Sequence, residues 1–178
     1  MGDAYSCLLF FLACFIHECG HLLCSGLCRR RIRSLSLSAS GAKIALAGNL
    51  GSYKKDIAVA LSGSAANFLT CVLMRAFLPA FGKAEVFFFF SNLLLGAVNL
   101  LWVGELDGAV ALESALCAFF DPIKAEGLMR ITGALGIVIL LLLGVGVMVI
   151  TGGNFSLLLL WLGIMAKNKK DRQSGLFR

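Results

Sequence analysis

The sequence predicts an all-α integral membrane protein of four or five transmembrane helices, with a short β-hairpin-like loop after the first helix. Of its 178 residues, 59% are hydrophobic and only 15% are charged, whereas about a quarter of the residues in a soluble domain are charged. A helix needs roughly 20 apolar residues to cross a bilayer, and several stretches reach that length. We therefore expect a single membrane domain over residues 1–178, surrounded by lipid.

The apolar segments alternate with short polar stretches along the chain. The expected helices cover Ala4 to Cys28, Ile57 to Ala80, Val86 to Val103, Leu128 to Ile150 and Asn154 to Ala166. The last segment is short for a span, so it would either tilt little or end in the membrane interface.

A strand pattern follows the first helix. Residues 34–40 alternate serine with mostly apolar residues, and such a period of two is typical of a β-strand. A weaker alternation resumes after Gly41. Because a Ser-Gly turn separates the two runs, the sequence favours a short hairpin.

The basic residues indicate an orientation. Thirteen of the sixteen lysines and arginines lie after the first, third and fifth segments, and Lys83 alone lies in a loop on the opposite side. Since basic loops are cytoplasmic, we expect the N-terminus outside and the C-terminus in the cytoplasm. The net charge of +6 is then a topology signal and does not indicate nucleic-acid binding. The seven cysteines form no CxxC pair and do not indicate a disulfide framework.

A candidate metal-binding motif lies in the first apolar segment. His17 and His21, the only histidines in the chain, enclose Glu18 in the sequence His-Glu-Cys-Gly-His. Residues four apart share a face of a helix, so both imidazoles can bind one metal ion while Glu18 activates a water molecule as general base. Ionisable residues inside a span are costly and usually functional. The alternative is that the three side chains form purely structural hydrogen bonds.

Two histidines do not complete a catalytic zinc site, which usually has three protein ligands and one open position. The candidates for the third ligand are Glu105, Asp107 and Glu113. On a helix, Glu105 and Asp107 would point about 200° apart, so both could not face the histidines. Gly108 follows Asp107 and would let the backbone approach the metal closely.

These motifs together resemble the site-2 protease family of intramembrane zinc metalloproteases, most closely its small sporulation-type members without a PDZ domain. The similarity covers residues 7–117, the expected metalloprotease core, and leaves 128–166 as accessory helices. Within the core, 62–67 resembles the family's Gly-Pro-x-x-Asn element and 92–108 its Asn-x-Leu-Pro-x-x-x-Leu-Asp-Gly element. The departures are Ser64, Trp102, Val103 and Ala109. They affect substrate gating and leave the metal ligands intact.

The resemblance implies an endopeptidase of the bacterial cell membrane that cleaves a transmembrane or membrane-associated protein. One Zn²⁺ would be held by His17, His21 and Asp107, with Glu18 activating the water, and Asn67 would help to hold the substrate. A membrane metal transporter is the main alternative, although the chain lacks the histidine-rich loops and repeated halves of transporters. An inactive protease-like scaffold is another, against which the intact Glu18 argues.

The expected hairpin offers a way to recognise substrate. A helical substrate hides its amides and has to unwind locally, and an unwound strand can pair with an exposed sheet edge. Leu35 and Leu37 would then contact the substrate. An interfacial loop without a substrate role is the alternative.

The orientation can be tested by labelling intact cells. His17 and His21 lie about 18 Å and 12 Å before Arg29 by helix rise, so the predicted topology puts the metal site in the cytoplasmic half of the membrane. A membrane-impermeant amine reagent should label Lys83 and spare Lys54 and Lys169. Labelling of Lys54 from outside would invert the topology.

Overall fold

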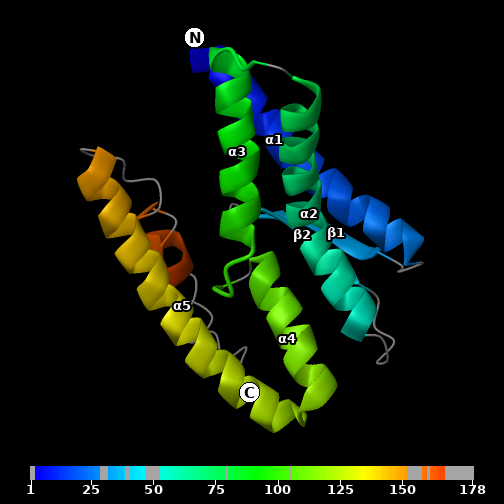
Figure 1. The fold of residues 1–178 in the computed structure, drawn as a ribbon. Helices are drawn as coiled ribbons and strands as arrows, with labels where there is room; N and C mark the ends of the chain where they lie inside the picture. The colour runs from blue at the N-terminus through cyan, green and yellow to red at the C-terminus, as the bar shows by residue number, and fades with distance from the viewer. Residues whose placement is uncertain are drawn as a thin grey trace.

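The computed structural model describes residues 3–28, 32–38, 41–46, 53–78, 80–104, 106–151, 158–159 and 161–166. Its elements follow the order α1, β1, β2, α2, α3, α4, α5 (Figure 1). The helices are α1 (Asp3–Leu27), α2 (Tyr53–Phe77), α3 (Lys83–Asn99), α4 (Asp107–Phe119) and α5 (Pro122–Thr151). Residues 161–166 are also helical.

Three of the described helices, α1, α2 and α5, are long and apolar enough to cross a membrane by length and composition. Helix α3 has 17 residues and α4 has 13, so each is shorter than the roughly 20 residues that a span needs. The architecture is that of an all-helical membrane protein with one small sheet in a loop.

Along the chain, the sheet follows α1 and precedes α2. Strands β1 (Ile32–Ser38) and β2 (Gly41–Leu46) pair antiparallel, with Leu35 opposite Ile44 and Ser38 opposite Gly41. The register shifts between Ile32 and Ser34. The ladder therefore occupies the part of the loop where the alternating serines favour strands.

The third predicted helix is wrong in its C-terminal part. We expected it to run to Val103, but α3 ends at Asn99 and the chain turns before α4 begins at Asp107. Leu106 has extended backbone (φ −69°, ψ 156°). The helical rotation that separates Glu105 from Asp107 by about 200° therefore does not apply. Helix α5 begins at Pro122, earlier than the expected Leu128, because proline suits the first turn of a helix.

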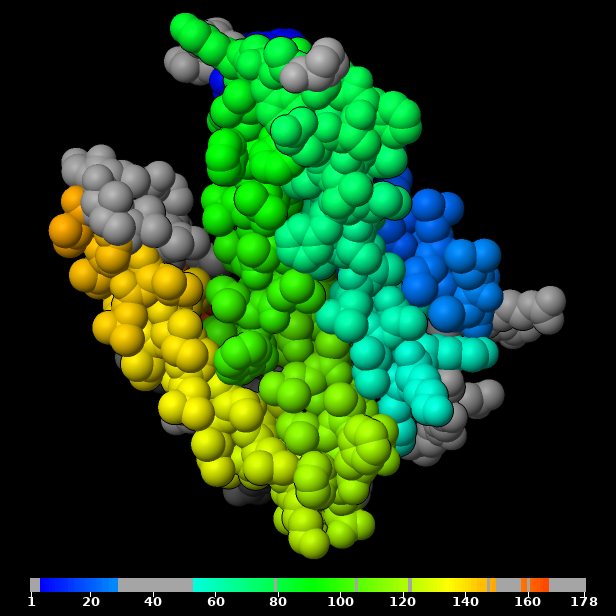
Figure 2. All heavy atoms as spheres, in the orientation of Figure 1, coloured from blue at the N-terminus to red at the C-terminus, as the bar shows by residue number. Residues whose placement is uncertain are grey.

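Helix α2 is the centre of the bundle, since it packs against α1, α3 and α4. Its buried face consists mostly of small residues: Val59, Ala60, Gly63, Ser64, Asn67 and Cys71. Small side chains let helix backbones approach closely in a membrane. Helix α5 lies to one side of this bundle (Figures 1 and 2), and its main described neighbour is α4.

Gly20 sets the distance between α1 and α2. A Cβ added to Gly20 would lie 2.6 Å from the Ser62 carbonyl oxygen and 2.9 Å from the Ala66 Cβ. A backbone atom cannot move aside as a flexible side chain can. The two helices therefore meet at this glycine without room for a methyl group.

Alanine substitutions at Gly20 and Gly26 should distinguish the effect of helix packing on the free energy of unfolding from the effect of helix propensity. Gly20→Ala should lower the free energy of unfolding by about 1–3 kcal/mol, as overpacking does. Gly26→Ala, on the same helix and with none of the described part of the chain within 4 Å of the added Cβ, should be neutral or stabilising because alanine favours helices. Thermal unfolding in detergent measures both. Equal melting temperatures would contradict the close approach.

Candidate metal centre

Two buried histidines on α1 meet a carboxylate from α4. His17 and His21 are 5% and 7% exposed, one helical turn apart, with their Nε2 atoms 3.1 Å from each other. Asp107 Oδ2 lies 2.9 Å from His17 Nε2 and 3.2 Å from His21 Nε2. Among the described residues, this is the group of three side chains that could hold a metal ion. The structure thus brings together the two histidines and one of the three acidic candidates.

Hydrogen bonds on the other side of each imidazole fix where its proton lies. His21 Nδ1 is 2.8 Å from the Val59 carbonyl oxygen, which can only accept, so Nδ1 donates. His17 Nδ1 is 2.7 Å from Asn67 Oδ1. The Asn67 amide nitrogen donates to the Ala13 carbonyl and to Asn92 Oδ1, so Oδ1 must be the atom that faces His17. Both histidines therefore carry their proton on Nδ1 when neutral.

The lone pairs of both Nε2 atoms then point toward the Asp107 carboxylate and toward each other. Neutral Nε2 atoms without a proton cannot hydrogen-bond across the 3.1 Å that separates them. A cation between the three atoms satisfies all of them at once. Two ligands bound to a tetrahedral zinc at 2.0–2.1 Å stand about 3.3 Å apart, and the observed separations of 2.9, 3.1 and 3.2 Å are within a few tenths of that value. The type and spacing of the three donors would suit one zinc ion, which usually has three protein ligands in a catalytic site.

Helix α2 closes the back of the centre through Gly63. A Cβ at Gly63 would overlap His21 Nε2 and lie 2.8 Å from His17 Cε1. Any larger residue would push both imidazoles away from Asp107. A second set of contacts, from Val59 and Asn67 on the same helix, holds the ring nitrogens. Such outer partners orient metal-binding histidines and keep them in one tautomer.

Asp107 is held by the turn between α3 and α4. It is the first residue of α4, where the helix dipole favours a negative charge. The expectation that Gly108 allows close approach to the metal stays a prediction, and the structure gives this glycine a place in the turn. A Cβ there would overlap the Leu100 carbonyl group and lie 2.8 Å from the Leu101 carbonyl oxygen.

The remaining acidic residues have different surroundings. Glu18 is partly exposed and has no hydrogen-bond or ion-pair partner among the described residues, so its carboxylate is available to a water molecule. Glu113 is exposed on α4 and does not belong to the donor group. Glu105 and the side chains of Leu35 and Leu37 lie outside the described residues.

Asn67 has a structural position that the sequence does not predict. Its side chain is fully buried and its amide is bonded to His17, Ala13 and Asn92. The substrate role of Asn67 stays a prediction, and the structure adds a role behind the first histidine. Asn92, also fully buried, is a partner that sequence reasoning missed. The available signal was an amide in the middle of an apolar span, which usually marks a polar contact.

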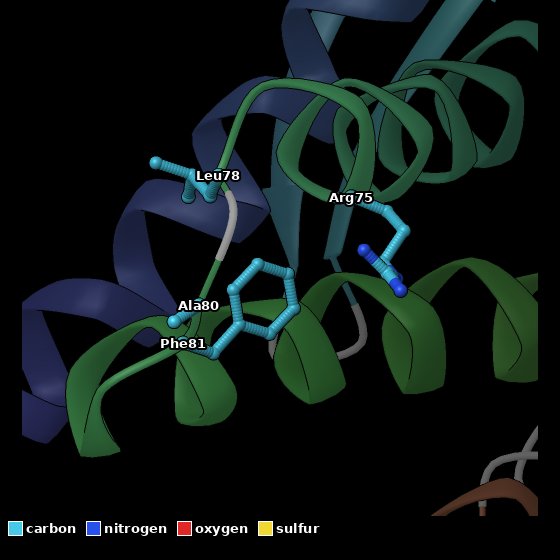
Figure 3. A pocket seen from close by; sticks show the side chains of 4 residues that line it. All are labelled: Arg75, Leu78, Ala80 and Phe81. Atoms are coloured by element: carbon cyan, nitrogen blue, oxygen red, sulfur yellow. The ribbon is translucent and has the colours of Figure 1, made fainter.

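A small open pocket lies away from this centre, at the turn between α2 and α3. It is lined by Arg75, Leu78, Ala80 and Phe81 (Figure 3). Arg75 is eight residues beyond Asn67 on α2, about 12 Å along the helix axis. None of the lining residues contributes to the donor group, so the pocket is not part of the metal centre.

The fold and the donor group define a helical membrane protein with a candidate metal centre inside its helix bundle. The chain has a site-2 protease-like fold. It is similar to the solved structure of the site-2 protease from Methanocaldococcus jannaschii, with a TM-score of 0.63 and 20% sequence identity over 88% of this chain and 72% of that one. At this identity the likeness concerns the fold alone. No protein-family model matches the chain, and no curated protein sequence does.

The choice of third ligand can be tested by metal analysis of purified variants. Asp107→Asn should reduce zinc affinity by more than the 10–100-fold that loss of an outer-shell partner costs, because it removes a charged donor. Glu105→Gln should leave zinc content close to that of the unmodified protein. The assignment fails if Glu105→Gln removes the zinc and Asp107→Asn retains it.

Proposed function

We propose that this protein is an intramembrane zinc metalloprotease that cleaves a transmembrane or membrane-associated protein. The observation that carries the proposal is the convergence of His17, His21 and Asp107 on one point inside a bundle of apolar helices. Placing two buried histidines and a partly buried aspartate in such surroundings is costly unless they are paired or bind a metal. The site-2 protease-like fold independently supports the same reaction.

The role of each group in the proposed reaction follows from the arrangement of the donor residues. A bound zinc ion supplies Lewis-acid polarisation of the scissile carbonyl and lowers the pKa of water. Glu18 is adjacent to His17 in sequence and partly exposed, so we assign it the proton transfer. It accepts a proton as the water oxygen adds to the carbonyl carbon, and it returns that proton to the amide nitrogen as the carbon–nitrogen bond breaks. Asn67 and the Val59 carbonyl keep the histidines oriented throughout.

The membrane arrangement is part of the proposal. Helices α1, α2 and α5 span the bilayer, α3 with α4 forms a fourth span that is interrupted just before Asp107, and the expected segment from Asn154 to Ala166 makes the fifth crossing. The excess of basic residues after the first and last apolar segments supports an external N-terminus and a cytoplasmic C-terminus. The centre then lies in the cytoplasmic half of the membrane, where water can reach it.

Substrate would be held in an extended form. A peptide bond is accessible to hydrolysis only after the substrate helix unwinds, and the freed amides then need partners. The sheet of β1 and β2 has two strands, so each strand has one edge outside their shared ladder. We propose that the unwound segment pairs with such an edge and that Leu35 and Leu37 contact its side chains. An interfacial loop is the competing role for this sheet.

The general base offers the sharpest test of the proposed reaction. Glu18→Gln should keep zinc bound, because glutamine has nearly the same volume and Glu18 is not a ligand. Cleavage should fall by at least the factor of about 10²–10⁴ that general-base catalysis contributes. A comparison of new protein termini in membranes from cells that express each form would identify the substrate, and purified protein then gives the rate.

Glu113→Gln is the matched control, since it makes the same chemical change at an exposed site outside the donor group. Its cleavage rate should equal that of the unmodified protein. Near-normal cleavage by the Glu18→Gln protein would rule out the mechanism proposed here, whatever its zinc content.

A further inference from the structure

The turn that precedes Asp107 is docked on α5. Val103 is fully buried, and a Cβ added to Gly136 of α5 would overlap its Cγ2 atom. The same Cβ would lie 3.2 Å from Trp102 Cδ1 and 3.3 Å from Trp102 Nε1. Because Gly136 has no side chain, Trp102 and Val103 of the turn pack directly against the backbone of α5.

A second accessory segment covers the next residue. Gly104 has φ +61°, a left-handed conformation that glycine adopts without strain. A Cβ there would lie 3.1 Å from Ile164 Cγ2, in the helical residues 161–166. Residues 102–104 are therefore in contact with both α5 and the later helical segment.

Two backbone hydrogen bonds link this turn to the start of α4, where Asp107 lies. The Leu106 amide donates to the Val103 carbonyl oxygen at 3.3 Å, and the Ala109 amide donates to the Leu106 carbonyl oxygen at 2.9 Å. Only three residues separate Val103 from Asp107. Gly108 leaves no space on the other side, because it packs against the Leu100 carbonyl group. We therefore expect a displacement of Val103 to shift the Asp107 carboxylate through these two hydrogen bonds.

We propose that α5 is a positioning element for the third metal ligand, acting through the contact between Gly136 and Val103. The inference rests on the metal centre of the proposed function and extends it to a helix that contributes no ligand. Val103 is β-branched and enclosed, so it cannot rotate away from an added methyl group. Either the turn moves, taking Asp107 with it, or α5 moves outward.

Alanine variants at two positions of α5 distinguish these outcomes. Gly136→Ala should weaken zinc binding by about 10–100-fold, the usual effect of losing a partner that supports a ligand. Gly133→Ala, one turn earlier with no atom of the described residues within 4 Å of its Cβ, should bind zinc like the unmodified protein. Zinc affinity is measured on the full-length protein in detergent by competition with a chromophoric chelator, and thermal unfolding of the metal-free protein is measured alongside.

A second substitution that restores space at the contact distinguishes displacement of Asp107 from a general loss of stability. Val103→Ala in the Gly136→Ala background makes room for the added methyl group, and zinc affinity should return to within about threefold of normal, which is the non-additivity expected of residues in contact. Normal zinc binding by Gly136→Ala alone would overturn the inference and leave the metal centre intact. So would a double variant that regains its melting temperature without regaining zinc. Failure of the folded, unmodified protein to bind zinc would instead overturn the metal centre itself.

Discussion

The close approach of α1 and α2 is the constraint on which the candidate metal centre depends. The two helices meet through a glycine on each side. Gly20 of α1 faces the Ser62 carbonyl oxygen, and Gly63 of α2 faces the imidazoles of His17 and His21. Because neither contact leaves room for a methyl group, α2 lies near enough for the Val59 carbonyl to reach His21. A bundle with ordinary helix spacing would leave both Nδ1 atoms without partners, at a cost of about 1–3 kcal/mol for each buried polar group.

The same closeness explains how an apolar bundle accommodates so many polar groups. Asn67 joins three helices, since it bonds to His17 and the Ala13 carbonyl on α1 and to Asn92 on α3. Asn92 in turn donates to the Phe88 carbonyl oxygen. The side-chain amide groups of Asn67 and Asn92 both have partners, which is the condition under which a buried network stabilises a single arrangement. The network also determines which nitrogen of His17 is free to bind a metal.

The local sequence pattern was sufficient to predict two of the three donor residues. His17 and His21 share a face because helical periodicity fixes residues four apart, and the structure places them as that rule requires. Asp107 is a different case, since it lies 86 residues from His21, and the sequence left three acidic candidates among which the neighbouring Gly108 and the family resemblance favoured it. The break at Asn99 could not be predicted, because residues 100–103 are as apolar as the helix before them. Long-range contacts make that break: Gly108 against Leu100, and Val103 against Gly136. The buried position of Asn67 behind His17 likewise depends on packing between helices.

The separation of the donors along the chain also has a consequence for biosynthesis. At about 5–20 residues per second, the ribosome adds the 86 residues from His21 to Asp107 in roughly 4–17 s. During that interval the nascent protein carries two histidines and no carboxylate to complete the group. The sequence order therefore delays assembly of the group until more than half of the 178 residues have been added.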